Sequence, residues 1–142
     1  MTNALALAVD YLRRSRLRVC AIEALIEAGD YPDAVRESQE TVELAIKSLL
    51  KLAGLSYPRA HDVSRLLRDP AIEGVLLELG EVESIEKVSK ALRRDRELSF
   101  YGDEDVVPLD YYEIDDARTA LQGVLRVIEL VGRAFDHHGT PT

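Results

Sequence analysis

The amino-acid sequence predicts an all-α protein, built as an up-and-down four-helix bundle with one or two extra short helices. Apolar residues recur at three- and four-residue steps along four long segments, as expected for helices that each bury one face. No segment alternates polar and apolar residues with a period of two, so no strand is predicted. Glycine and proline fall between the periodic segments, where they favour helix ends and turns.

The first helix is predicted from about residue 3 to residue 28. Gly29 follows it and tolerates the left-handed conformation that often ends a helix. Cys20, the only cysteine, allows no intrachain disulfide, and we expect it to be a small buried hydrophobe. The predicted inner face consists of Leu5, Val9, Leu12, Val19, Ile22 and Ile26, with Arg16 on the same stripe.

The second helix is predicted to begin after Asp30, whose carboxylate can cap free backbone N–H groups, and to end at Gly54. Pro32 is tolerated in the first turn, and Asp33 suits the positive end of the helix dipole. One face carries only small residues, which let another helix approach closely, so this helix is predicted to be central. These small residues are Ala34, Ser38, Thr41, Ala45 and Ser48.

Two short helices are predicted next, at residues 59–67 and at residues 71–79, the second ended by Gly80. A long helix over residues 81–100 follows and ends at Gly102, and Arg96 falls on its apolar stripe. An acidic loop then covers residues 103–112. The last helix is predicted at residues 114–135. The stripe of the 81–100 helix consists of Val82, Ile85, Val88, Ser89, Leu92 and Ser99.

Length and charge restrict the class of protein. The chain of 142 residues suits one domain, predicted to span residues 1–142. It has 18 Lys and Arg against 26 Asp and Glu, a net charge of −8, which disfavours non-specific binding of nucleic acid. Local basic patches still allow RNA binding. We identify neither a signal peptide nor a membrane-spanning segment, and we expect a cytoplasmic protein without membrane association.

No motif for a metal or a cofactor is present, because the sequence contains no glycine-rich phosphate loop, no dinucleotide fingerprint and no paired zinc ligands. We therefore predict neither. The arginines at 93, 94 and 96 form the most suggestive cluster. Arg96 lies on an apolar stripe, where its charge needs an anion, a carboxylate or water. It therefore either binds an anion in a groove, or reaches solvent or pairs with an acid such as Glu43.

Several other polar residues have two interpretations each. His61, which precedes Asp62, is either a general base oriented by that carboxylate or a structural histidine that tethers a short helix. The arginines at 13, 14, 16 and 18 form either a solvated face or an RNA-facing strip. Tyr101 and the tyrosine pair at 111 and 112 either stack on a base or pack on the end of the bundle.

Five segments, in their order and spacing, resemble the HEPN domain family. They are DYPDAVRESQETVELAIKSLL at 30–50, LAGL at 52–55, HDV at 61–63, RELSFYGD at 96–103 and ARTA at 117–120. The resemblance extends from about residue 12 to residue 131. It implies a bundle of four or five helices that forms a homodimer. Many members are metal-independent ribonucleases, and others are non-catalytic or act beside a small nucleotidyltransferase in toxin–antitoxin pairs.

The ribonuclease members that this sequence resembles carry an arginine followed, after four to six residues, by a histidine. Counted from Arg96, the histidine would fall at Tyr101, Gly102 or Asp103, and none of these is histidine. Proton transfer to and from the RNA 2′-hydroxyl therefore lacks its usual imidazole. Tyr101, with an ordinary pKa of about 10, is a weak substitute, and His61 is the remaining candidate.

The resemblance and the missing histidine together predict a non-catalytic dimeric subunit. We expect it to bind a partner protein, a nucleotidyltransferase of a toxin–antitoxin type pair, and a nucleotide or RNA. Its anion-binding residues are predicted to be Arg93, Arg96, Tyr101 and Asp103. One alternative is a ribonuclease with a diverged site that uses Arg96 with Tyr101 or His61. The other is a helical scaffold or interaction module that binds no ligand.

Overall fold

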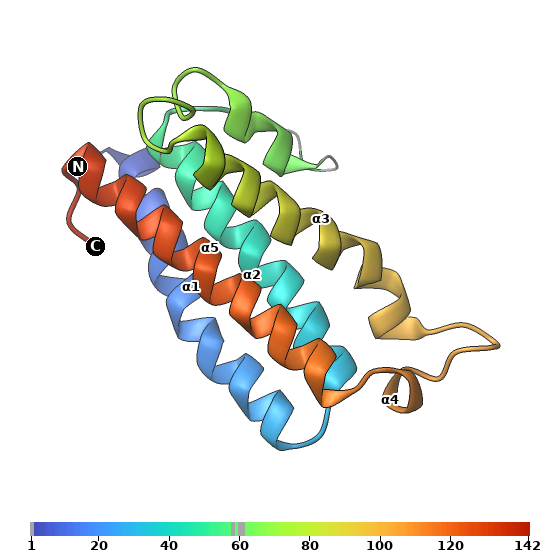
Figure 1. Ribbon diagram of the computed structural model, residues 1–142. Helices are drawn as coiled ribbons and strands as arrows, with labels where there is room; N and C mark the ends of the chain where they lie inside the picture. The colour runs from blue at the N-terminus through green and yellow to red at the C-terminus, as the bar shows by residue number, and fades with distance from the viewer. Residues whose placement is uncertain (1, 58, 60–61) are drawn as a thin grey trace.

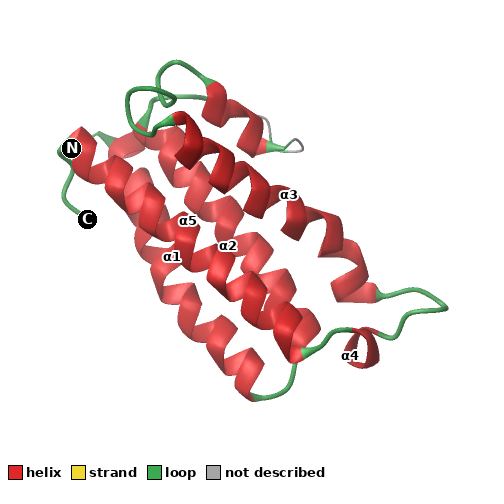
Figure 2. Ribbon diagram, viewed as in Figure 1, coloured by secondary structure: helices red, strands yellow, loops and turns green. Residues whose placement is uncertain are grey.

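The structure, a computed structural model, describes residues 2–57, 59 and 62–142. Four long helices run up and down side by side and form a bundle (Figure 1). The described residues contain no strand (Figure 2), so the predicted all-α bundle is confirmed. The elements are α1 (Asn3–Glu27), α2 (Tyr31–Leu52), the 3-10 helix η1 (Val63–Arg68), α3 (Leu79–Tyr101), α4 (Pro108–Tyr111) and α5 (Ile114–His138).

Helix α2 is the central helix, as its stripe of small residues predicts. It packs on α1, α3 and α5, and the five small residues of the stripe are fully buried. Their hydroxyl groups are satisfied within the helix: Ser38 donates to the carbonyl oxygen of Ala34 at 2.7 Å, and Ser48 donates to that of Ala45 at 2.6 Å. The buried hydroxyls therefore leave no donor unpaired at the centre of the bundle.

One hydrophobic core joins the long helices. Its largest fully buried side chains include Leu12 of α1, Ile46 and Leu49 of α2, Ile85 of α3 and Phe135 of α5. Apolar burial of this kind supplies most of the free energy that holds the helices together. No helix among the described residues is long and apolar enough to span a membrane.

The prediction of a helix at residues 71–79 is wrong. Residues 69–78 form tight turns, because the Asp69 carboxylate accepts the N–H of Ala71 at 2.9 Å and its carbonyl accepts that of Ile72 at 2.8 Å. Gly74, at φ +84°, then turns the chain back. Gly80 does not end a helix: it lies in the first turn of α3.

Helix η1 begins later than predicted, at Val63, and part of the predicted segment lies outside the described residues. The long acidic loop contains the one-turn helix α4. The prediction that Cys20 is buried is also wrong, because its side chain is exposed. Cys20 precedes the buried Ile22 by two positions, which is about 200° around the helix, so it faces away from the core.

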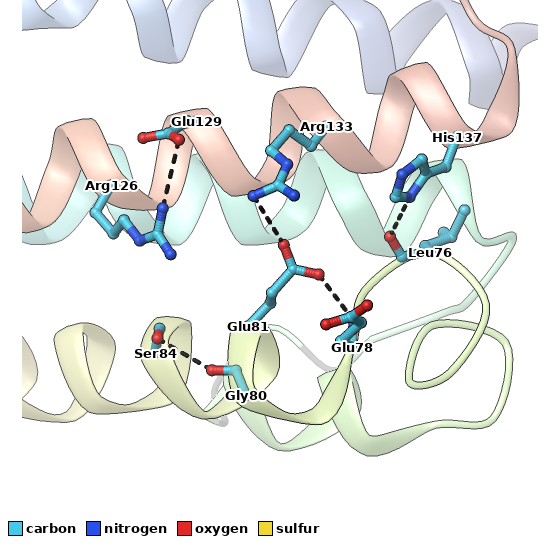
Figure 3. A network of polar contacts seen from close by, with 9 residues as sticks. All are labelled: Leu76, Glu78, Gly80, Glu81, Ser84, Arg126, Glu129, Arg133 and His137. Carbon is cyan, nitrogen blue, oxygen red and sulfur yellow. Dashed lines mark hydrogen bonds and ion pairs between the residues drawn. The ribbon is translucent and has the colours of Figure 1, made fainter.

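Polar contacts connect the C-terminal half of α5 to the start of α3 (Figure 3). Arg133 Nη1 lies 3.3 Å from Glu81 Oε2, and Glu81 Oε1 accepts the backbone N–H of Glu78 at 2.9 Å. His137 Nδ1 donates to the carbonyl oxygen of Leu76 at 3.2 Å. These contacts fix where α3 begins and which of its faces meets the bundle.

Candidate anion-binding site

A surface groove of about 380 Å³ contains Arg96 together with four other cationic side chains. We call it the basic groove. Two carboxylates, Glu40 and Glu43, also line it, together with Leu44. Its cationic residues are Arg14 and Arg18 of α1, Lys47 of α2, Arg59 of the segment after α2, and Arg96 of α3.

Helical spacing explains how the basic groove is built. Arg14 and Arg18 are four residues apart, so both lie on one side of α1. Glu40, Glu43 and Lys47 follow the same three- and four-residue rule on α2. Because α2 packs on both α1 and α3, its outward face forms the floor, and the arginines of α1 and α3 stand on either side.

Positive charge exceeds negative charge in the basic groove, since five cations face two carboxylates. Both carboxylates are already engaged. Glu43 lies 3.4 Å from Lys47 Nζ and accepts the side-chain amide of Gln39 at 3.2 Å, while Glu40 lies 3.3 Å from Arg36 Nη2. Arg14 and Arg18 have partners outside the lining, Asp10 at 2.8 Å and Glu37 at 3.5 Å, so among the described residues Arg59 and Arg96 are the groove cations that enter no ion pair. An anion entering the groove would find these two charges available.

Arg96 itself is exposed at the edge of the basic groove. Among the described residues, its guanidinium takes part in no ion pair and no side-chain hydrogen bond. Glu43 lines the same groove but pairs with Lys47. The predicted pairing of Arg96 with Glu43 is therefore absent among the described residues, and its guanidinium both reaches solvent and lines the basic groove.

Arg93 has a different position. Its Nη1 atom lies 3.3 Å from Asp62 Oδ1, and Asp62 also accepts the hydroxyl of Ser64 at 2.6 Å. Partial burial opposes ionisation of Asp62, but the hydrogen bonds from Ser64 and the charge of Arg93 outweigh it and lower the pKa of Asp62. Arg93 thus ties η1 to α3 and does not line the basic groove.

Tyr101 and Asp103 do not line the basic groove either. Tyr101 is 76% exposed and meets the ring of Phe100 edge-on at 4.5 Å. The Asp103 carboxylate accepts the N–H of Asp105 at 2.8 Å within the loop after α3. Of the residues that the sequence singles out as anion-binding, only Arg96 is therefore placed in the groove. His61 lies outside the described residues.

The sequence did not predict that Arg14, Arg18, Lys47 and Arg59 lie around Arg96. The four-residue spacing of Arg14 and Arg18 was the available signal, because it indicates one helix face. Lys47 gave no signal, since its neighbours in the sequence, residues 44–46 and 48–50, are apolar apart from one serine. Only the packing of α1, α2 and α3 brings these cations together.

Comparison with known proteins gives a consistent result. A family model described as HEPN domain matches residues 8–134. A protein of Methanocaldococcus jannaschii named as a candidate toxin is 28% identical over 127 residues, which cover 85% of this chain and 83% of that protein. The crystal structure of an archaeal HEPN homologue has a TM-score of 0.64 at 22% identity, over 88% of this chain and 94% of that one.

Proposed function

This chain belongs to the HEPN domain family, and from that premise we propose that it is a non-catalytic subunit which binds a phosphate-bearing ligand, a nucleotide or RNA, in the basic groove. The observation that carries the proposal is the excess of cations around Arg96 on a chain whose net charge is −8. Clustered guanidinium and ammonium groups attract phosphate strongly. The acidic remainder of the surface limits binding elsewhere.

Fluorescence anisotropy with a labelled single-stranded RNA tests this binding, with a nucleoside triphosphate as competitor. Arg96→Gln should weaken binding about five- to tenfold, the loss expected for one charge-assisted contact. Arg118→Gln is the matched control, because Arg118 is an exposed arginine of α5 that does not line the groove. Equal affinities for the two variants and the unmodified chain would refute the proposal.

We further propose a homodimer that pairs with a nucleotidyltransferase in a toxin–antitoxin type pair. The support is family membership and the relative named as a candidate toxin. Light scattering after gel filtration measures the oligomeric state directly. Co-expression with a nucleotidyltransferase encoded beside this gene tests the pairing, and failure of the two chains to co-purify would argue against it.

A ribonuclease with a diverged site is the second candidate, favoured by the availability of the Arg96 guanidinium in the basic groove. Incubation of the purified protein with tRNA and mRNA, beside Arg96→Ala, distinguishes the two functions. Cleavage lost in Arg96→Ala would favour the ribonuclease. Saturable RNA binding without cleavage would favour the non-catalytic subunit.

A further inference from the structure

A second and larger groove lies between α3 and α5, with α4 at one end, and it shares no residue with the basic groove. We call it the α3–α5 groove. Its volume is about 750 Å³, within the range of roughly 300–1,000 Å³ that is typical of small-molecule sites. Its apolar residues are Val35, Val88, Ala91, Leu92, Ala120 and Gly123.

Small residues keep the α3–α5 groove open. Ala91 of α3 and Thr119 and Ala120 of α5 line it with short side chains. At Gly123 the two helices are close, because a Cβ atom there would lie 2.8 Å from Val88 Cγ1. These short side chains leave space between the two helices above a buried floor that includes Leu92, and the longer side chains of the lining stand around it.

Tyrosines form one end of the α3–α5 groove. The rings of Tyr111 and Tyr112 meet edge-on at 5.1 Å, and Tyr112 is buried while Tyr111 is 55% exposed. The hydroxyl of Tyr112 donates to Asp95 Oδ1 at 3.4 Å, which holds the ring in place. Burial and the charge of Asp95 raise the pKa of Tyr112 above its ordinary value.

Three cations, Lys87, Arg94 and Arg126, and two carboxylates, Asp95 and Asp116, line the α3–α5 groove, so its net charge is +1. Its two carboxylates have partners within the chain: Asp95 accepts from Tyr112, and Asp116 Oδ2 accepts the N–H of Glu113 at 2.8 Å. Among the described residues, Lys87 and Arg94 enter no ion pair. A third cation of the groove, Arg126, lies 3.4 Å from Glu129, whose side chain is 60% exposed.

We propose that the α3–α5 groove is a second binding site, for a small organic anion with an apolar, ring-like body. The body lies on the floor of valine, leucine and alanine, beside the exposed face of Tyr111, and the anionic group is bound by Arg94, Lys87 and Arg126. Burial of the body excludes water from one side and strengthens the charge contact. A polyphosphate without an apolar part gains no binding free energy from this floor. The α3–α5 groove should therefore bind a different class of ligand from the basic groove.

The dye 8-anilinonaphthalene-1-sulfonate has this chemistry and serves as the probe with the full chain. We expect saturable binding of one dye per chain, measured by fluorescence enhancement. Ala91→Phe should fill the groove and weaken binding at least about tenfold, and Thr119→Phe should repeat the effect if Ala91→Phe folds poorly. Ala21→Phe, at an exposed alanine of α1 outside the groove, is the matched control and should bind as the unmodified chain does.

Charge is tested separately. Arg94→Gln should weaken binding of the sulfonate dye about fivefold and leave binding of the uncharged N-phenyl-1-naphthylamine unchanged. Dye binding that does not saturate, or that survives both phenylalanine variants, would overturn the proposal. So would binding that falls as protein concentration rises, because a second copy would then occupy the groove. RNA anisotropy on the same variants should be unaffected, which separates this site from the proposed function.

Discussion

The arginines at 93 and 96 show how strongly the surroundings decide what a side chain does. Both belong to the same short basic cluster of α3. Arg93 turns toward Asp62 and holds η1, whereas Arg96 turns toward the basic groove. Three residues along a helix correspond to about 300° of rotation, so the two side chains leave the helix in neighbouring but different directions. One arginine therefore stabilises the fold, and the other is available to a ligand.

Asp33 should make the free energy of unfolding depend on pH. Its carboxyl group shares a hydrogen bond with Asp30, and this bond, partial burial and the charge of Asp30 raise the pKa of Asp33 to about 6 from 3.8. Between these values the folded chain holds a proton that the unfolded chain releases. The contribution of Asp33 to stability is thus present below about pH 4 and is lost as pH rises through about 6.

Asp33→Asn should remove this loss. Relative to the unmodified chain, the variant should gain about 1–2 kcal/mol of stability between acid and neutral pH, a value reduced for the partial exposure of the group. Urea denaturation of both chains at several pH values measures it. If the free energy of unfolding changes with pH in the same way for both chains, the Asp30–Asp33 contact is not the cause of the pH dependence.

Gly102 should not tolerate a side chain. It ends α3 at φ +66° and ψ −158°, and an added Cβ atom would run into the backbone carbonyl oxygen of Val106 and lie 2.7 Å from Cδ of Pro108. Gly102→Ala is expected to cost roughly 2 kcal/mol or more. Gly80→Ala is the control, because Gly80 is helical and has open space around it; it should be neutral or stabilise by up to about 1 kcal/mol. Thermal melting of both variants measures the difference.

Helix α3 is held by contacts at both of its ends. It packs more extensively on α2 than on α5, and this uneven packing accompanies the α3–α5 groove. Its first turn is fixed by the reciprocal contacts of Glu78 and Glu81 and by Arg133 of α5 (Figure 3). Its last turn is fixed by Gly102. Both grooves are lined by α3, so its placement determines the geometry of each.

Removal of the Glu81 carboxylate should therefore loosen the start of α3. Glu81→Ala deletes the acceptor of the Glu78 N–H and the partner of Arg133, and it should lower the free energy of unfolding by about 1–2 kcal/mol. Glu83→Ala, at an exposed site of the same helix, should change it by less than about 0.5 kcal/mol. Hydrogen exchange at residues 79–84 should rise only in Glu81→Ala; unchanged exchange there would contradict the assigned role.

The basic groove differs in charge from the chain as a whole. The net charge is −8, yet the basic groove has five cations against two carboxylates. A field of this kind repels polyanions from most of the surface and draws them to one face. A phosphate-bearing ligand would accordingly approach along the side of α2 that lies between α1 and α3.

RNA binding should for this reason be strongly dependent on salt. Two cations of the basic groove, Arg59 and Arg96, enter no ion pair among the described residues, so the affinity should fall roughly tenfold between about 50 and 200 mM salt. Binding of the naphthalene dye, which rests partly on apolar contact, should fall much less. Anisotropy and dye fluorescence measured in the same salt series test this, and an RNA affinity that does not respond to salt would exclude the basic groove as the site.

The sequence by itself determined the helical class, the central place of α2 and the extent of the long helices, because hydrophobic periodicity reports which face of each helix is buried. Two predictions from the sequence were wrong. Residues 71–79 form no helix, because the side chain and the carbonyl of Asp69 accept backbone N–H groups there, and Cys20 is exposed. Only the tertiary structure decided which cations surround Arg96. Periodicity is a property of one helix, whereas a groove depends on which helices are neighbours and how each is rotated, and those are set by packing across distant parts of the chain.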